Sequence, residues 1–405
     1  MHWGVIKPSE SVQTRLRLDL GLRRAILGLN EWTVPGAGGV FFVRQLSWAC
    51  MGLSLARDAE SPCTPAQVAE ALEAFAGWLV VRRGAHADAE PRIQGKRKFA
   101  DRKSLSFFDV IQRGAYVTVP FRRSATRALP GLNLCVREEA RFSALELTPT
   151  GVELANAAFA SGFEKGVEPR AWLQRWIDAG DQRPQKVEDS IKRTLEPSFT
   201  SKQEKQIVLQ RIHADIRREN LAQLLARFDN DTLATLHGRE GFLAGLRHDE
   251  HRDQLRVCFA FEDVREAALQ AAQAVSDSIQ VAATSASELA LHNIVSDCFF
   301  RLGKTCVALE RVLLPATPRE AQVFCSEQLP GVALEDRILK LITRVPMIFS
   351  ISDRRVDHAI GYDPTKELLA DSAYDQLESE DAPIRGVPSP LLRFRRLLSD
   401  CGAFH

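Results

Sequence analysis

The chain has 405 residues and a mass of 45.1 kDa, enough for two or three ordinary domains. Apolar residues make up 45% of it and charged residues 26%, which is typical of soluble globular proteins and excludes disordered, collagen-like and membrane-spanning classes. The net charge of +1 gives no global sign of a polyanionic partner, so such a signal has to be local. Met1 does not open a secretory signal, and we expect a cytoplasmic protein.

The eight cysteines are scattered along the chain, with no C-x-x-C pair and no pair of histidines nearby. Their spacing gives no support for a structural zinc site. In a chain without a secretory signal, such cysteines are expected to be buried, reduced thiols. The sequence therefore predicts neither a metal nor another cofactor.

The first hundred residues favour helices. Residues 23–32 and 41–56 read as helices on either side of a glycine-rich loop at 34–39. A third helix begins where Thr64 is followed by Pro65 and Gln67, the residues of a capping box, and runs to about Val81. The polar and basic stretch 82–103 is expected to be a loop or extension.

Residues 104–160 carry the most organised pattern in the sequence. Their predicted elements are a helix at 104–112, a turn at 116–119, a helix from Pro120 to before Pro130, strands at 132–136 and 142–147, and a helix from Thr148-Pro149 to Ala160. In the second helix Phe121, Ala125, Ala128 and Leu129 form one apolar stripe.

This order of elements resembles a winged helix-turn-helix domain, with its core at 104–160. The exit 145–155, LELTPTGVELA, is similar to the last wing strand and following helix of bacterial winged-helix regulators. The resemblance implies that 120–129 is a recognition helix in a DNA major groove, with four outward residues facing the DNA: Arg122, Arg123, Thr126 and Arg127. Arginine suits this role because its planar fork can bind a guanine edge or a phosphate through two hydrogen bonds.

The distribution of charge gives an independent indication that the same segment binds nucleic acid. Between Arg82 and Arg127 there are twelve Lys or Arg and four Asp or Glu, a local net charge of +8 that leaves −7 for the remainder. Five of the basic residues precede the helix-turn-helix as an arm expected to bind phosphates: Lys96, Arg97, Lys98, Arg102 and Lys103. Glu138 and Glu139 at the presumed wing tip argue against a wing contact, because they would repel a phosphate backbone.

From Phe163 onward almost every signal is helical. Long helices are expected at 202–228, 252–280 and 286–314, the last two as an antiparallel hairpin, with capping boxes at 201–204, 285–288 and 317–320. An acidic run follows at 371–381, and a last helix at 391–398. We therefore predict a mainly α protein, with a winged-helix-containing region at 1–162 and an all-α domain at 163–405 for oligomerisation or partner binding.

One cluster suggests an enzyme instead. His248-Asp249 resembles the doublet of HD-type phosphohydrolases, whose histidines and aspartates hold metals that activate water, with His213 and Asp297 as further candidate ligands. An exposed charged turn between helices is the favoured explanation of the doublet. Gly303-Lys304-Thr305 resembles the end of a phosphate-binding loop, but lacks its earlier glycine and falls in a helical pattern. No Ser or Cys has a recognisable neighbouring base.

Taken together, the sequence favours a non-enzymatic protein that binds double-stranded DNA or acts as an adaptor. Its architecture suggests a regulator, or a subunit of a bacterial DNA-processing or antiviral defence complex, with a protein partner or self-association through the helical C-terminal half. The alternatives are a metal-dependent phosphohydrolase or nuclease at His248-Asp249, and an interaction scaffold whose winged helix binds protein.

Overall fold

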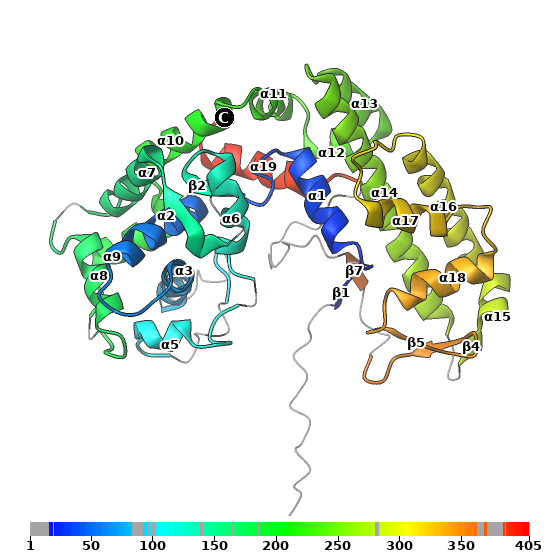
Figure 1. The fold of residues 1–405 in the computed structure, drawn as a ribbon, viewed down its shortest axis with the longest axis horizontal. Coiled ribbons are helices and arrows are strands. Elements are labelled where there is room, and N and C mark those ends of the chain that lie inside the picture. The colour runs from blue at the N-terminus through cyan, green and yellow to red at the C-terminus, as the bar shows by residue number, and fades with distance from the viewer. Residues whose placement is uncertain are drawn as a thin grey trace, which may run out of the picture. The chain divides into compact units, whose positions relative to one another are not determined.

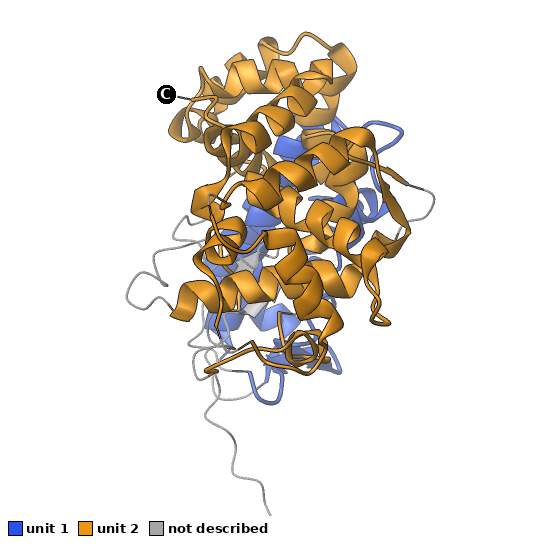
Figure 2. Ribbon diagram, turned by 90° about the vertical axis from the view of Figure 1, so that its left-hand side faces the viewer, with its two compact units in different colours: residues 1–29, 256–373 blue, residues 30–255, 374–405 orange. Residues whose placement is uncertain are grey.

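The computed structural model is mainly helical, as the sequence predicts (Figure 1). It divides into two compact units: unit 1 comprises residues 1–29 and 256–373, and unit 2 comprises residues 30–255 and 374–405 (Figure 2). The boundary expected after residue 162 falls inside unit 2. The structure describes residues 16–18, 20–82, 92–95, 98, 102–117, 119–137, 141–163, 165–184, 186–279, 283–362, 368–370, 384 and 386–404.

Unit 2 contains helices and one two-stranded antiparallel hairpin, β2–β3, in which Val136 pairs with Glu146. Its helices are α2 (Val43–Asp58), α3 (Pro65–Arg82), α5 (Phe107–Ile111), α6 (Arg122–Gly131), η1 (Phe142–Ala144), α7 (Pro149–Ala160), α8 (Pro169–Asp178), α9 (Asp189–Leu195), η2 (Pro197–Phe199), α10 (Lys202–His213), α11 (Ile216–Leu225), α12 (Asn230–Ala234), α13 (Leu236–Ala244) and α19 (Ser389–Asp400). Its strands are β2 (Cys135–Arg137) and β3 (Leu145–Leu147).

Helix α2 is the centre of unit 2. Every residue from Val43 to Leu55 is buried, and the helix packs against α3, α7 and α6. Gly52 allows the close approach of α3, since a Cβ there would lie 2.6 Å from the Cα of Ala69. A helix that is buried on all sides has to bury its polar residues as well, and each of them needs a partner.

Among these polar residues, Arg44 most needs a partner, because its charged side chain is fully buried. Its Nη1 lies 3.0 Å from Glu204 Oε1 on α10, whose side chain is fully buried too. Nη2 donates to Ser161 Oγ and to the carbonyl oxygen of Phe199. Glu204 also accepts from Ser47 and completes the capping box that begins α10, so one carboxylate joins two helices.

The N-terminus of α2 is capped by a residue from the other end of the chain. Phe42 occupies the capping position and has no suitable side chain. Asp400, the last residue of α19, accepts a hydrogen bond of 2.8 Å from the backbone N–H of Val43. Its other oxygen lies 3.2 Å from Arg92 Nη1. The carboxylate satisfies an N–H of the first helical turn that would otherwise be orphaned.

Unit 1 combines helices with small sheets. Strands β5 and β6 form an antiparallel hairpin, β4 pairs with β6, and β1 pairs with β7 in parallel. The elements of unit 1 are β1 (Leu16–Leu18), β4 (Thr284–Ser285), α15 (Ala286–Leu291), α16 (Asn293–Glu310), α17 (Arg319–Glu327), α18 (Leu334–Thr343), β5 (Phe349–Ser352), β6 (Arg355–His358) and β7 (Leu368–Ala370). Helices α1 (Arg23–Thr33) and α14 (Asp249–Ser278) each begin in one unit and end in the other.

The prediction that residues 163–405 are all helical is wrong, because β4, β6 and β5 form a three-stranded sheet there. Two predicted long helices are also interrupted. Asp215 separates α10 from α11 and caps α11, and His292 separates α15 from α16. The capping boxes at Ser201 and Ser285 are confirmed, whereas Thr317 caps no helix; its hydroxyl accepts from the N–H of Leu314 instead.

Within the described ranges, every helix falls short of the length or the hydropathy needed to span a lipid bilayer.

We expect Asp400→Ala to lower the free energy of unfolding of unit 2 by about 1 kcal/mol, the usual effect of removing a helix N-cap. Denaturant unfolding of the full chain measures this loss. Asp181→Ala is the matched control, because Asp181 is an exposed aspartate in a turn. Equal stability of the two variants would contradict the capping role of Asp400.

Candidate nucleic-acid interface

The segment 104–160 contains helices and two strands in the predicted order, but the strands are shorter than expected: β2 covers only Cys135–Arg137, and residues 142–144 form the 3-10 helix η1 before β3. Ser106 and Asp109 make a capping box at the start of α5, and Thr148 caps α7 by accepting from the N–H of Gly151. Between them lie α6 and the β2–β3 hairpin, and α6 extends through Pro130 to Gly131 rather than ending before it.

The first turn of α6 is held by a buried carboxylate from α3. Glu73 is 1% exposed, and its two oxygens accept the backbone N–H groups of Phe121 at 2.8 Å and Arg122 at 2.6 Å. Burial raises the pKa of Glu73 to about 8, although these hydrogen bonds and the charge of Arg122 oppose the rise. Because Phe121 cannot cap a helix, α6 depends on this tertiary cap.

The inner face of α6 contacts the glycine-rich loop at 34–39. Gln45 of α2 donates to Ser124 Oγ on α6 and to the carbonyl oxygen of Gly39. Gly36, at φ +69°, lies against Gly131 so closely that a Cβ on it would be 2.7 Å from the Cα of Gly131. Packing against α6 therefore explains Gly36 and Gly39, since a Cβ on Gly39 would lie 2.9 Å from Ser124 Cβ.

Arg218 of α11 also binds both the glycine-rich loop and α6. It is 5% exposed, and its Nη1 donates to the carbonyl oxygens of Pro35 and Gly131 while Nη2 donates to that of Arg211. The guanidinium therefore joins the glycine-rich loop to the C-terminal end of α6.

The outer face of α6 carries exposed arginines. Arg123 and Arg127, one helical turn apart, are both exposed, so their side chains lie on the same side of the helix. Arg122 is half-buried and bound within the protein, with Nε and Nη2 at 3.0 and 2.8 Å from Glu70 Oε2. Thr126, also half-buried, donates its hydroxyl to the carbonyl oxygen of Arg122. The structure thus divides the four predicted DNA-facing residues into two exposed and two half-buried ones.

The predicted basic arm is only partly described: Lys96 and Arg97 lie outside the described residues, as do Glu138, Glu139 and the acidic run 371–381. Lys98 is exposed and donates to the carbonyl oxygen of Gly114. Arg102 lies 4.0 Å from Asp109, and its carbonyl oxygen accepts from the indole N–H of Trp78. Lys103 is exposed. These contacts join the arm to α3 and to the α5–α6 turn.

The described candidate ligands do not form a metal site. His213 ends α10, His248 precedes α14, and Asp249 is 87% exposed and paired with Arg252. Across the part of the chain that the structure describes, no group of three or more His, Cys, Asp or Glu side chains could hold a metal ion. The geometry gives the phosphohydrolase alternative no support.

His251, from the same sequence cluster, is a core residue rather than part of an exposed turn. It is 1% exposed, and its Nε2 lies 3.1 Å from the carbonyl oxygen of Trp32 and 3.4 Å from that of Thr33. Burial lowers the pKa of His251, which keeps the ring neutral so that Nε2–H donates to these carbonyls.

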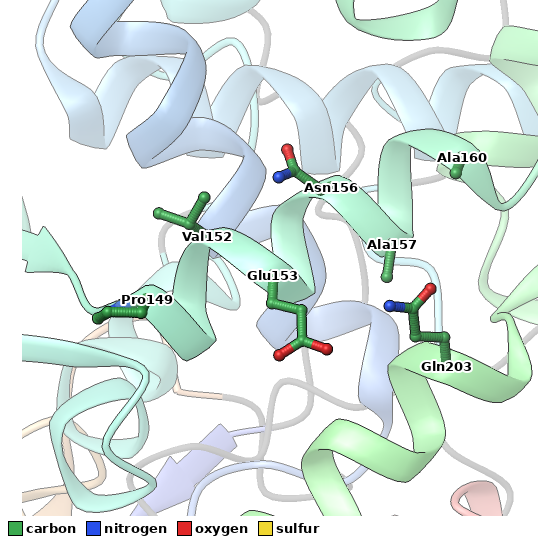
Figure 3. A pocket seen from close by; sticks show the side chains of 7 residues that line it. All are labelled: Pro149, Val152, Glu153, Asn156, Ala157, Ala160 and Gln203. Atoms are coloured by element: carbon green, nitrogen blue, oxygen red, sulfur yellow. The ribbon is translucent and has the colours of Figure 1, made fainter.

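One open depression lies on the surface of unit 2, between α7 and the start of α10 (Figure 3). Its lining is Pro149, Val152, Glu153, Asn156, Ala157, Ala160 and Gln203. Glu153 is its single ionisable side chain, and no residue of α6 contributes to it. The depression brings together no pair of groups for acid–base or nucleophilic catalysis.

Comparison with known proteins adds no constraint. The chain matches no protein-family model, and no curated protein or solved structure is significantly similar to it. Any functional assignment therefore depends on the residues and geometry described above.

The buried carboxyl of Glu73 makes stability depend on pH in a defined direction. Its folded-state pKa of about 8 exceeds the ordinary 4.5, so the folded state retains a proton that the unfolded state releases between these values. The contribution of Glu73 to stability is complete below pH 4.5 and declines by about 1 kcal/mol per pH unit up to about pH 8.

Glu73→Gln should remove this slope, because the amide does not titrate. The measurement is the difference in unfolding free energy between wild type and Glu73→Gln from pH 5 to pH 9. We expect the advantage of wild type to shrink as the pH rises and to level off above pH 8. A difference that stays constant, or grows with pH, would show that Glu73 does not retain its proton.

Proposed function

We propose that unit 2 binds double-stranded DNA through the outer face of α6, as a non-catalytic DNA-binding or adaptor module with a winged-helix arrangement. The observation that carries this proposal is the contrast between the two faces of α6. The inner face is fixed by Gln45, Gly36 and Arg218, while the outer face presents Arg123 and Arg127.

A helix anchored in this way suits DNA recognition. Arg123 and Arg127 are one turn apart on a helix whose ends are both held by buried groups, so binding would order little beyond the side chains themselves. Guanidinium groups at this spacing can contact successive phosphates or a base edge in the major groove. Lys103 and the remainder of the arm would add phosphate contacts that depend on salt.

Arg122 has a different role in this proposal. Its guanidinium is held by Glu70 and its backbone N–H by Glu73, so it positions the first turn of α6 beside the DNA. The hydroxyl of Thr126 donates to the carbonyl oxygen of Arg122. Thr126 would therefore contact DNA only through its methyl group, or by accepting a hydrogen bond on the same hydroxyl.

The adaptor part of the proposal concerns unit 1. Leu291, Ile294 and Phe300 on α15 and α16 are exposed apolar side chains, with 83%, 61% and 63% of their surface accessible. We infer that this surface contacts a protein partner or a second copy of the chain, in a regulator or in a DNA-processing or defence complex.

The main test is fluorescence-anisotropy binding to a labelled duplex of mixed sequence over a range of salt. Arg123→Ala/Arg127→Ala should reduce the slope of log K against log salt by about 1.8, at roughly 0.9 for each phosphate that the variant no longer neutralises. A smaller change in slope together with a weaker sequence preference would place the two arginines on bases. The matched control is Lys165→Ala/Arg175→Ala, which removes two exposed charges elsewhere in unit 2.

Two results would overturn the proposal. One is the absence of wild-type binding even at low salt, which would make the helix-turn-helix a protein-packing element. The other is an equal reduction of slope in the control variant, which would indicate diffuse attraction without a role for α6.

A separate experiment tests whether Arg122 positions α6 while Arg123 and Arg127 contact DNA. Arg122→Ala should lower the free energy of unfolding by about 0.5–1 kcal/mol, because it breaks a half-buried ion pair. It should leave the salt slope almost unchanged, unlike Arg123→Ala. A slope reduced as much by Arg122→Ala as by Arg123→Ala would place Arg122 on the phosphates.

A further inference from the structure

Helix α16 turns one face to the core of unit 1 and the opposite face to solvent. The inner face carries Phe299, Leu302, Cys306 and Leu309, which are fully buried, and the helix packs against α15, α17 and α18. Arg337 of α18 donates to the carbonyl oxygen of Phe299, and its guanidinium carbon lies 5.6 Å from the centre of the Phe299 ring. The packing of this inner face determines which residues of α16 face outward.

The outward face is a stripe of exposed residues spaced for one side of a helix. Its members are Asn293, Asp297, Phe300, Lys304 and Ala308, at intervals of four, three, four and four residues. Phe300, in the middle of the stripe, is 63% exposed. Aromatic side chains are enriched at the centres of protein interfaces, where their burial contributes much of the binding energy. Phe300 is therefore the residue around which a partner would pack.

The two charges of the stripe lie on opposite sides of Phe300. Asp297 precedes the ring by one helical turn, and Lys304 follows it by one turn, with Nζ 5.2 Å from the ring centre. No acidic residue lies three or four positions from Lys304 along the helix. Arg301, four positions after Asp297, donates to Cys298 Sγ. Asp297 and Lys304 both face solvent, so their charges are available to a partner.

We propose that the outward face of α16 is a self-association surface, on which α16 of a second copy of the chain packs in the antiparallel direction. The inference rests on the adaptor part of the proposed function and identifies the second copy as the partner. A two-fold axis between Phe300 and Arg301 sets Asp297 opposite Lys304 of the second copy, and Lys304 opposite its Asp297. The same axis brings the two Phe300 rings together.

This pairing uses nearly the whole helix. Helix α16 has 18 residues and is about 27 Å long, and the axis lies within one residue of its midpoint. In this register the exposed Ile294 lies opposite the half-buried Val307 of the second copy, and Asn293 lies opposite its small Ala308. The contact therefore joins apolar side chains as well as opposite charges.

The order of the charges selects both the partner and the direction. A two-fold interface consists of one patch that complements itself, so each acidic group needs a basic group at an equal distance from the axis. Asp297 and Lys304 meet this condition. A parallel pair would set the two aspartates against each other and the two lysines against each other, and like charges at an interface oppose binding.

Sedimentation velocity of the full chain without DNA tests the pairing. One helical face is small beside the roughly 800 Å² that each partner buries in a stable complex, so we expect a weak dimer, measured from about 1 to about 100 µM. Phe300→Asp should weaken dimerisation by about tenfold or more, because it places two carboxylates at the axis. The matched control is Ile360→Asp, which changes another exposed apolar residue of unit 1. Circular dichroism should show both variants folded, because both side chains are exposed.

Charge exchange tests the antiparallel direction. Asp297→Lys and Lys304→Asp should each weaken the dimer by about tenfold, because each sets like charges opposite one another at two symmetric positions. The double variant Asp297→Lys/Lys304→Asp restores both attractions and should dimerise as wild type does. In a parallel pair each residue faces its own counterpart, so the single variants would behave like wild type.

Three results would overturn the proposal: a wild-type chain that is monomeric at about 100 µM, a dimer that Phe300→Asp weakens no more than Ile360→Asp does, or a double variant as weak as the single ones. These measurements are made without DNA, so they are independent of the salt slope that tests α6. A monomer that binds DNA through Arg123 and Arg127 would overturn the pairing alone, and a dimer without DNA affinity would overturn the DNA-binding proposal alone.

Discussion

The buried ion pair between Arg44 and Glu204 is the constraint on which unit 2 depends. Both side chains are fully buried, so neither charge can be relieved by water, and the pair is tolerable only while α2 and α10 keep their relative position. Removing one partner from such a pair typically costs about 3–5 kcal/mol, because the other charge stays buried. Ser47, Ser161 and the carbonyl oxygen of Phe199 supply further hydrogen bonds to the pair and tie α2 to the segments that carry them.

The position of α2 in turn determines where α6 lies. Gln45, the residue after Arg44, bonds Ser124 on α6, and the first turn of α6 is held by Glu73 of α3, itself packed on α2. The face of α6 that these groups leave uncovered carries Arg123 and Arg127. The proposed DNA-binding surface is thus a consequence of how the polar groups of a fully buried helix find partners.

Local rules in the sequence predicted some features and long-range contacts determined the others. Thr148 before Pro149, Ser201 before Glu204 and Ser285 before Glu288 mark helix starts that the structure confirms, because the capping group lies within three residues. Glu73 and Asp400 cap helices 48 and 357 residues away, which no local pattern can show. The same holds for Arg122: helical periodicity placed it on a polar face, and only the position of Glu70 on α3 reveals that it forms an ion pair.

The most direct test of this account is hydrogen–deuterium exchange of the full chain with and without a short DNA duplex at low salt. A rigid α6 that docks on DNA predicts slow exchange in α6 already in the free protein, and further protection on binding confined to α6, the α5–α6 turn and the segment near Lys103. Protection elsewhere with none at α6, or rapid exchange of α6 in the free protein, would contradict the claim that a pre-organised α6 is the DNA-binding element.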